Sequence, residues 1–230
     1  MSTNIRTKMN KTTLVLGATG AVGKALLKNV LKDSNYTTVF MMGRRAVELD
    51  ASIPKEKLVQ KIVKFEALEE NRQDFRNIND VCCCLGTTRA DAGSAENFLK
   101  IDQEYVINSA RMIIEENPSK NNESTLKSET EERLSEAGFE KVSIFRPGFL
   151  EVEELRAKTR YLETLAGAVI PKVNGLFNLH ISIPVIHVGQ AMKLTAQQSN
   201  SIPKDIHIYT SKTGTKVFIF SKKNIDEMTK

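Results

Sequence analysis

The sequence lacks several features that would assign it to a class of protein at once. No apolar stretch approaches the roughly 18 residues of a membrane-spanning helix, and the N-terminal segment lacks the apolar core of a secretory signal. We therefore expect neither an integral membrane protein nor a secreted one. The 33 basic and 28 acidic residues give a net charge of +5 but are interspersed along the chain, so we expect a mixed solvated surface and no nucleic-acid partner.

Cysteine and histidine are scarce, and their spacing does not suit a metal site. The cysteines are consecutive, and no histidine lies near them in sequence. Because neighbouring side chains of a strand point to opposite faces, the three thiols cannot converge on one ion. We predict no metal site and interpret the cysteines as small buried side chains in a reducing compartment. The residues concerned are Cys82, Cys83, Cys84, His180, His187 and His207.

Length and composition favour one domain over residues 1–230, since 40% of the residues are hydrophobic and 27% are charged, as in ordinary globular proteins. The first segment, MSTNIRTKMNKTT, is basic and contains no acidic residue. It weakly resembles a mitochondrial targeting segment, and a frayed basic terminus explains it equally well.

The segment TTLVLGATGAVGKALLKNVL, residues 12–31, has the order strand, glycine turn, helix. An apolar β-branched run is followed by glycines at three-residue spacing and then by apolar residues at helical spacing. Such glycines allow a tight turn, a close approach of backbone N–H groups to a pyrophosphate, and close packing of the helix on the strand. The segment predicts a Rossmann-like α/β fold, with a doubly wound parallel sheet and helices on both faces; a structural glycine turn is the alternative. The predicted cofactor-binding residues here are Gly17, Ala18, Thr19, Gly20, Ala21, Val22 and Gly23.

The next expected strand, TTVFMMGRR, ends in Arg44 and Arg45. Chains that prefer NAD usually carry an acidic residue at this place to hold the ribose 2′-hydroxyl. Two guanidinium groups instead suit a 2′-phosphate. The pair therefore favours NADP(H), and surface arginines that cap a strand are the alternative.

Further elements are expected downstream. KIVKFEAL, residues 61–68, is predicted as the third strand, with Glu66 near the adenine, and QDFRNINDVCCCLGTT, residues 73–88, as a helix, a turn and the fourth strand. The small polar residues at the end of the latter are either neighbours of the cofactor or a plain loop, because open α/β sheets bind ligands at this edge. Residues 96–116 are predicted as a helix in which Tyr105 is a packing residue.

Several blocks together carry a family resemblance. GATGAVGKALLKNVL, MMGRR, CCCLGTTRADAG, KIDQEYVINSA, SIFRPGFL and SIPVIHVGQAM resemble the atypical short-chain dehydrogenase/reductases related to the human Tat-interactive protein and their fungal mitochondrial outer-membrane relatives. The resemblance implies a Rossmann-type sheet, an NADP(H) site and a peripheral position on the cytosolic side of the mitochondrial outer membrane. It extends the cofactor site to Leu85, Gly86, Thr87 and Thr88, and it implies a substrate-lid-like region over residues 150–200.

For catalysis, the resemblance implies a fifth strand that ends in Ser, then a Tyr, and a Lys four residues later. KSETEE, residues 127–132, matches the family's helix after that Lys, so Lys127 takes the lysine position and Glu123 stands at the tyrosine position. A carboxylate is ionised near neutral pH and does not replace a tyrosine hydroxyl.

The segment ENPSKNNEST, residues 116–125, lacks the apolar or β-branched run of a central strand and contains Pro118. We therefore predict that one central strand is missing and that this stretch stays solvated outside the sheet. Residues 140–148, EKVSIFRPG, are then expected to pair directly with strand four or to leave a gap beside it.

Two functions follow. The first is an NADP(H)-dependent oxidoreductase that acts on a carbonyl or hydroxyl group, with Lys127 as the catalytic residue that holds the nicotinamide ribose. The second is a non-catalytic NADP(H)-binding adaptor or regulatory protein, which the missing Ser and Tyr favour. A peripheral contact with the mitochondrial outer membrane, or with a protein partner, is expected for either.

Overall fold

The computed structural model describes residues 10–118, 123–126, 131–151, 182–197 and 202–230. Its strands are β1 (Lys11–Leu16), β2 (Tyr36–Gly43), β3 (Leu58–Ile62), β4 (Asp80–Cys83), β5 (Glu123–Leu126), β6 (Lys141–Arg146), β7 (Phe149–Glu151), β8 (Ser182–Pro184), β9 (His207–Thr210) and β10 (Lys216–Ser221). Its helices are α1 (Ala21–Leu31), α2 (Arg89–Ala92), α3 (Ala95–Leu99), α4 (Tyr105–Glu116), α5 (Glu131–Ser135), α7 (Val185–Ala196) and α8 (Lys222–Met228), with a 3₁₀ helix η1 (Phe65–Phe75) and a π-helical turn η2 (Lys100–Glu104).

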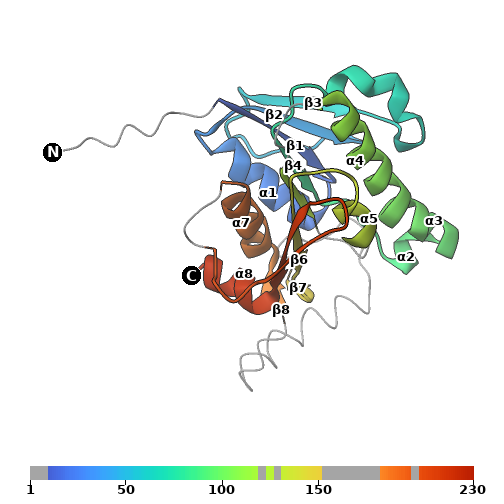
Figure 1. Cartoon of the computed structure of the whole chain (residues 1–230). Coiled ribbons are helices and arrows are strands. Elements are labelled where there is room, and N and C mark those ends of the chain that lie inside the picture. Colours follow the sequence, from blue (N-terminus) through green and yellow to red (C-terminus); the bar gives the residue numbers. More distant parts are fainter. Residues whose placement is uncertain (1–9, 119–122, 127–130, 152–181, 198–201) are drawn as a thin grey trace.

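One twisted sheet organises the described residues. Its eight strands run in the order β3-β2-β1-β4-β5-β6-β10-β9 (Figure 1). Every neighbouring pair is parallel except β9 with β10. The order reverses at β1, since β2 lies on one side of it and β4 on the other, and ligands of open parallel sheets bind outside the strand ends at such a point. The predicted doubly wound parallel sheet is confirmed.

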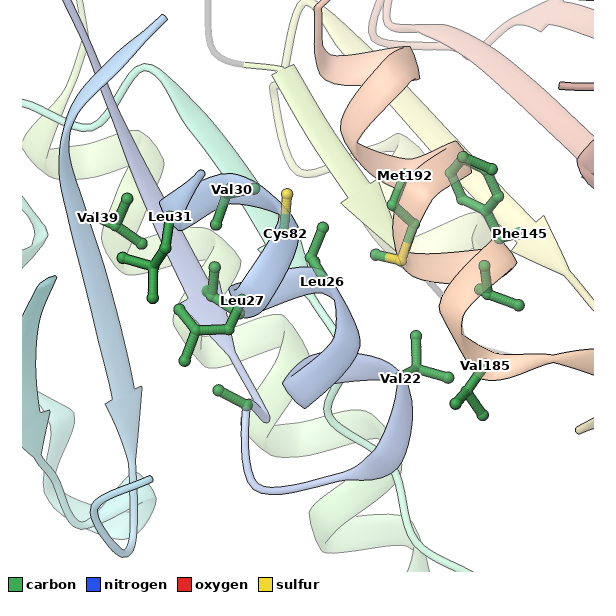
Figure 2. Close-up of a cluster of buried hydrophobic side chains, with 14 of the residues drawn as sticks. Val22, Leu26, Leu27, Val30, Leu31, Val39, Cys82, Phe145, Val185 and Met192 are labelled. Carbon is green, nitrogen blue, oxygen red and sulfur yellow. The ribbon is translucent and has the colours of Figure 1, made fainter. Parts of the chain in front are cut away.

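Helices cover both faces of the sheet. On one face α1 and α7 form a hydrophobic core with β1, β2, β4 and β6, and on the other α4 and η1 pack over the same strands (Figure 1). Figure 2 shows the apolar side chains of α1 between sheet residues such as Val39 and Cys82 and the α7 residue Met192. The apolar positions predicted for α1 are buried, which confirms that helix: Val22, Leu26, Leu27, Val30 and Leu31.

The contact between α1 and α7 depends on one glycine. A Cβ atom built on Gly189 would lie 2.8 Å from the backbone nitrogen of Leu26, a separation that side-chain carbons do not tolerate. The two helices can therefore approach closely only because this position has no side chain. No helix in the described part of the chain is long and apolar enough to cross a membrane.

The centre of the sheet differs from the prediction. β5 lies between β4 and β6, with Glu123 opposite Asp80 and Lys141 at one end and Leu126 opposite Cys83 and Ile144 at the other. The predictions of a missing central strand and of direct β4–β6 pairing or a gap were wrong. Of the stretch predicted to stay outside the sheet, residues 123–125 lie within it, and residues 119–122 lie outside the described residues.

Backbone hydrogen bonding explains the difference. A gap would leave N–H and C=O groups of both β4 and β6 unpaired inside the sheet, and one short strand satisfies both rows. β5 contains only four residues. It begins at Glu123 and therefore excludes Pro118, which the prediction had counted against a strand in addition to the missing apolar run.

Two other boundaries shift. β3 ends at Ile62, and Phe65 already begins η1, so the strand predicted over residues 61–68 lies too late in the sequence. The Phe65 side chain instead stacks on the Tyr105 ring, with centroids 5.0 Å apart. The helix predicted over residues 96–116 is divided into α3, η2 and α4.

Parts of two predictions lie outside the described residues. They are the N-terminal segment up to residue 9 and, of the region 150–200, residues 152–181 and 198–201. The targeting segment and the substrate lid therefore stay predictions.

A proline in the middle of β5 tests the strand. Thr125 is opposite Cys82 on β4 and Ser143 on β6, and Thr125→Pro removes a backbone donor from a central strand. We expect this change to lower the free energy of unfolding by roughly 3 kcal/mol, measured by urea denaturation.

Lys212→Pro is the matched control. Lys212 is the second residue of a turn closed by the Gly214 N–H and the Ser211 carbonyl oxygen at 3.0 Å, a position that proline favours. Equal urea midpoints for both variants would contradict the pairing of β5.

Candidate functional site

The turn between β1 and α1 lies against the end of β4. Gly17 has a φ of +76°, and a Cβ atom there would lie 2.5 Å from the carbonyl carbon of Cys84 and 2.6 Å from the nitrogen of Leu85. A residue with a side chain is therefore excluded by conformation and by space. The two strand ends that frame the predicted cofactor crevice thus meet backbone to backbone.

Gly23 closes the turn from the helix side. A Cβ atom on Gly23 would lie 2.3 Å from the Gly17 carbonyl oxygen. Gly20 differs, since a Cβ atom there would have only one neighbour within 4 Å, the Gly17 oxygen at 3.4 Å. Gly20 precedes α1 as its N-cap, so the turn leaves open space directly before the helix N-terminus, where backbone N–H groups and the helix dipole favour a phosphate.

The other predicted residues of this turn divide into two groups. Thr19 is exposed beside Gly20, and Ala21 is half-buried. Ala18 and Val22 are only 1% and 5% exposed and belong to the core under α1. Their side chains therefore pack, and only their backbone is left to approach a ligand.

The loop after β4 is fixed by a residue that the sequence analysis missed. The Thr87 N–H donates to the Asp102 carboxylate at 3.1 Å, and a Cβ atom on Gly86 would lie 3.2 Å from the same oxygen. Thr88 ends the loop as the N-cap of α2, accepting from the Asp91 N–H. Leu85 is partly buried and packs on the core below.

Asp102 lies in the π-helical turn η2, where the helix predicted over residues 96–116 changes its winding. Such turns often mark functional sites. Neither apolar spacing nor a motif indicates a carboxylate that accepts from a backbone group fifteen positions earlier. The interruption of the helix at η2 marks Asp102, but it is visible only in the structure and not in the sequence.

Arg44 and Arg45 follow β2 directly and are exposed. The Val63 N–H donates to the Gly43 carbonyl oxygen at 3.0 Å, so the chain leaves β2 and β3 at adjacent points. The arginines thus lie at the same edge of the sheet as the glycine turn, as the Rossmann arrangement requires of residues near the adenosine ribose.

Glu66, Tyr105 and Lys100 form a small cluster beside this edge. The Tyr105 hydroxyl donates to the Glu66 carboxylate, and Lys100 Nζ lies 3.4 Å from the same Glu66 oxygen. The Tyr105 hydrogen bond holds the pKa of Glu66 below its usual value, while burial raises the pKa of Tyr105 to about 12. Tyr105 is 5% exposed, which confirms its role as a packing residue.

The cysteines are buried or partly buried, as predicted for small packing side chains. Cys82 and Cys83 are buried and Cys84 is partly buried, and none of the three forms a disulfide. Burial raises the pKa of Cys83 to about 12, so its thiol stays protonated and unreactive at neutral pH.

The catalytic segment is only partly described. Glu123, at the position where the family resemblance expects tyrosine, is the first residue of β5 and pairs with Asp80, the first residue of β4. It therefore lies at the amino end of its strand, opposite the edge that carries the glycine turn. Leu126, not serine, ends the strand, and Lys127 lies outside the described residues.

Comparison with curated proteins identifies relatives over most of the chain. The sequence is 32% identical over 197 residues to Protein HTATIP2 of Rattus norvegicus, with 80% of each protein covered. It is 32% identical over 154 residues to "Protein FMP52, mitochondrial" of Candida albicans, over 60% of this chain and 66% of that protein. No family model matches the chain.

Solved structures share the fold. A short chain dehydrogenase family protein from Francisella tularensis superposes with a TM-score of 0.60 at 9% identity, over 94% of this chain and 99% of that one. A short chain dehydrogenase from Burkholderia cenocepacia, in complex with NADP, gives 0.53 at 14% identity, over 82% and 84%. The sheet and its covering helices are thus those of short-chain dehydrogenases.

The glycines of the turn should respond differently to alanine. Gly23→Ala forces a carbon onto the Gly17 carbonyl and is expected to lower the free energy of unfolding by about 1–3 kcal/mol. Gly20→Ala meets no such contact and should leave stability within about 0.5 kcal/mol, yet it places a methyl group where a phosphate would lie. Urea denaturation of both variants, with NADPH affinity measured for Gly20→Ala, checks this. Unchanged affinity in Gly20→Ala would contradict a ligand at this turn.

Proposed function

This chain belongs to the HTATIP2 family of short-chain dehydrogenase/reductase-related proteins, and from that premise we propose that it binds NADP(H) and transfers hydride between this cofactor and a carbonyl or hydroxyl substrate. The observation that carries the proposal is the glycine turn. At Gly17 and Gly23, neighbouring backbone atoms occupy the space that a side chain would need, whereas the space beside Gly20, before α1, is open. This is the arrangement that a dinucleotide pyrophosphate needs.

The preference for NADP(H) is supported by charge at the end of β2. Arg44 and Arg45 are exposed there, and guanidinium groups bind a phosphate by paired, charge-assisted hydrogen bonds. The structurally similar Burkholderia cenocepacia dehydrogenase has NADP bound. Residues 17–23 would hold the diphosphate, and the loop Leu85–Thr88, fixed by Asp102, would face the nicotinamide ribose.

The chemistry divides between the cofactor and the chain. The nicotinamide, when bound, supplies or accepts the hydride. We assign to Lys127 the role of holding the nicotinamide ribose, as the family resemblance implies. Glu123 is not proposed as the proton donor, because its backbone lies at the amino end of β5.

A second candidate function has its own observation. The residue at the end of β5 is Leu126, and Glu123 replaces the expected tyrosine. A chain without those two hydroxyl groups still keeps its glycine turn and arginines. A non-catalytic NADP(H)-binding adaptor or regulatory protein is therefore the alternative, with cofactor binding stabilising one shape for a partner.

For location we propose a peripheral position on the cytosolic side of the mitochondrial outer membrane, by contact with the membrane or with a protein partner. The support is that the Candida albicans relative is named mitochondrial. Fractionation of isolated mitochondria with protease and carbonate treatment tests it. Protease resistance in intact mitochondria would contradict a cytosolic-side position.

Thermal unfolding with and without nucleotide tests cofactor binding. A ligand that binds only the folded state at about 100 times its Kd adds roughly 2.7 kcal/mol, which corresponds to a rise in Tm of roughly 5–10 °C for a chain of this size. We expect NADPH to give this rise and NADH a smaller one. The combined Arg44→Ala and Arg45→Ala substitutions should remove the difference between the two. A Tm that neither nucleotide changes would overturn both candidate functions.

Hydride transfer separates the two candidates. If the oxidoreductase assignment holds, NADPH oxidation with a panel of aldehydes and ketones should be detectable and should fall at least about a hundredfold in Lys127→Ala. Lys204→Ala, an exposed lysine, is the matched control and should leave the rate unchanged. Confirmed NADPH binding without turnover of any carbonyl would favour the adaptor.

A further inference from the structure

Opposite charges lie next to the place assigned to the 2′-phosphate. β2 and β3 pair with Gly43 opposite Ile62, so the chain leaves these strands about 4.8 Å apart. Arg44 is the first residue after β2, and Glu66 follows four residues after the end of β3. A carboxylate thus accompanies the two arginines at one edge of the sheet.

Glu66 is held in place and is ionised. Its carboxylate accepts from the Tyr105 hydroxyl, and that hydrogen bond lowers its pKa. Tyr105 is in turn fixed by stacking on Phe65 and by burial in the core. Burial raises the pKa of Tyr105, and the positive charge of Arg44 partly opposes this effect. Arg44 therefore interacts electrostatically with this cluster.

Such a carboxylate should oppose NADP(H). It would repel a 2′-phosphate, whereas the acidic residue of NAD-preferring chains accepts a hydrogen bond from the 2′-hydroxyl. Lys100 compensates for it, since its Nζ lies 3.4 Å from the Glu66 oxygen. Lys100 belongs to η2, the same turn whose Asp102 fixes the loop after β4.

We propose that Lys100 is a specificity-determining residue, which favours NADP(H) over NAD(H) by cancelling the negative charge of Glu66 beside the 2′-phosphate. This proposal rests on the proposed cofactor function. With Lys100 in place, Arg44 and Arg45 keep an excess of positive charge at this edge. Without it, Glu66 cancels part of that excess and offers an acceptor to an unphosphorylated ribose.

The expected effect is modest because the pair is solvated. The side chains of Lys100 and Glu66 are 40% and 49% exposed, so their field is screened by water and salt. We expect Lys100→Met to lower the ratio of NADPH to NADH affinity by roughly threefold to tenfold at low ionic strength. The change should shrink as salt is added.

The test measures Kd values for NADPH and NADH in four proteins: wild type, Lys100→Met, Glu66→Gln and the double variant. Methionine keeps the length and apolar stem of the lysine, and glutamine keeps an acceptor for the Tyr105 hydroxyl. Glu66→Gln should raise the preference for NADPH. The double variant removes one charge of each sign and should return to within about twofold of wild type, since Coulomb contributions add.

The outcomes separate the cofactor assignment from the role of Lys100. An unchanged NADPH to NADH ratio in Lys100→Met, with NADPH still bound, overturns this proposal and leaves the cofactor assignment intact. A ratio that falls in Lys100→Met and is not restored in the double variant overturns charge cancellation. Failure of wild type to bind either nucleotide overturns the proposed function itself. Lys212→Met, at a side chain that is 84% exposed, is the matched control and should match wild type, and Tm values confirm folding.

Discussion

The contact of the Gly17 backbone with the end of β4 is the constraint on which the rest of the site depends. A Cβ atom at Gly17 would lie 2.5 Å from the Cys84 carbonyl carbon, and one at Gly23 would lie 2.3 Å from the Gly17 oxygen. Two main-chain segments and the first turn of a helix are thereby packed without side chains between them. The start of the Leu85–Thr88 loop and the turn before α1 are therefore brought together at one edge of the sheet, where the proposed dinucleotide would lie.

That contact holds only if α1 itself is fixed, and the fold achieves this from two directions. The apolar side of α1 is buried against the sheet, and α7 approaches its backbone through Gly189, where a Cβ atom would meet the Leu26 nitrogen at 2.8 Å. In the loop after β4, the Asp102 carboxylate accepts from the Thr87 N–H. The position of α1 is thus set by close packing, which tolerates little adjustment, and that of the loop by a hydrogen bond from its backbone to a carboxylate.

The sequence predicted well what periodicity and glycine spacing encode. The strand, turn and helix predicted over residues 12–31 were correct. Gly17 and Gly23 have no room for a side chain, and the apolar residues predicted for α1 are buried in the core. Asp102 and Lys100 escaped prediction because their partners, the Thr87 N–H and Glu66, lie far away in sequence. Such a contact requires the tertiary fold. The third strand was placed late because Phe65, which was counted as part of it, belongs to η1 and stacks on Tyr105.

The error at β5 has a different origin and bears on function. The prediction considered only side chains. Whether a strand lies between β4 and β6 depends on their backbone N–H and C=O groups, which even a polar segment can pair with. By the family resemblance, Glu123 stands at the tyrosine position, at the start of the family's catalytic helix. One segment cannot be both a central strand and the first turn of that helix. In this chain Glu123–Leu126 pairs with β4 and β6, so the segment that the family resemblance aligns with the tyrosine completes the sheet. The residues around Gly17 and Arg44 do not depend on this choice, so the proposed cofactor binding does not require the proposed catalysis.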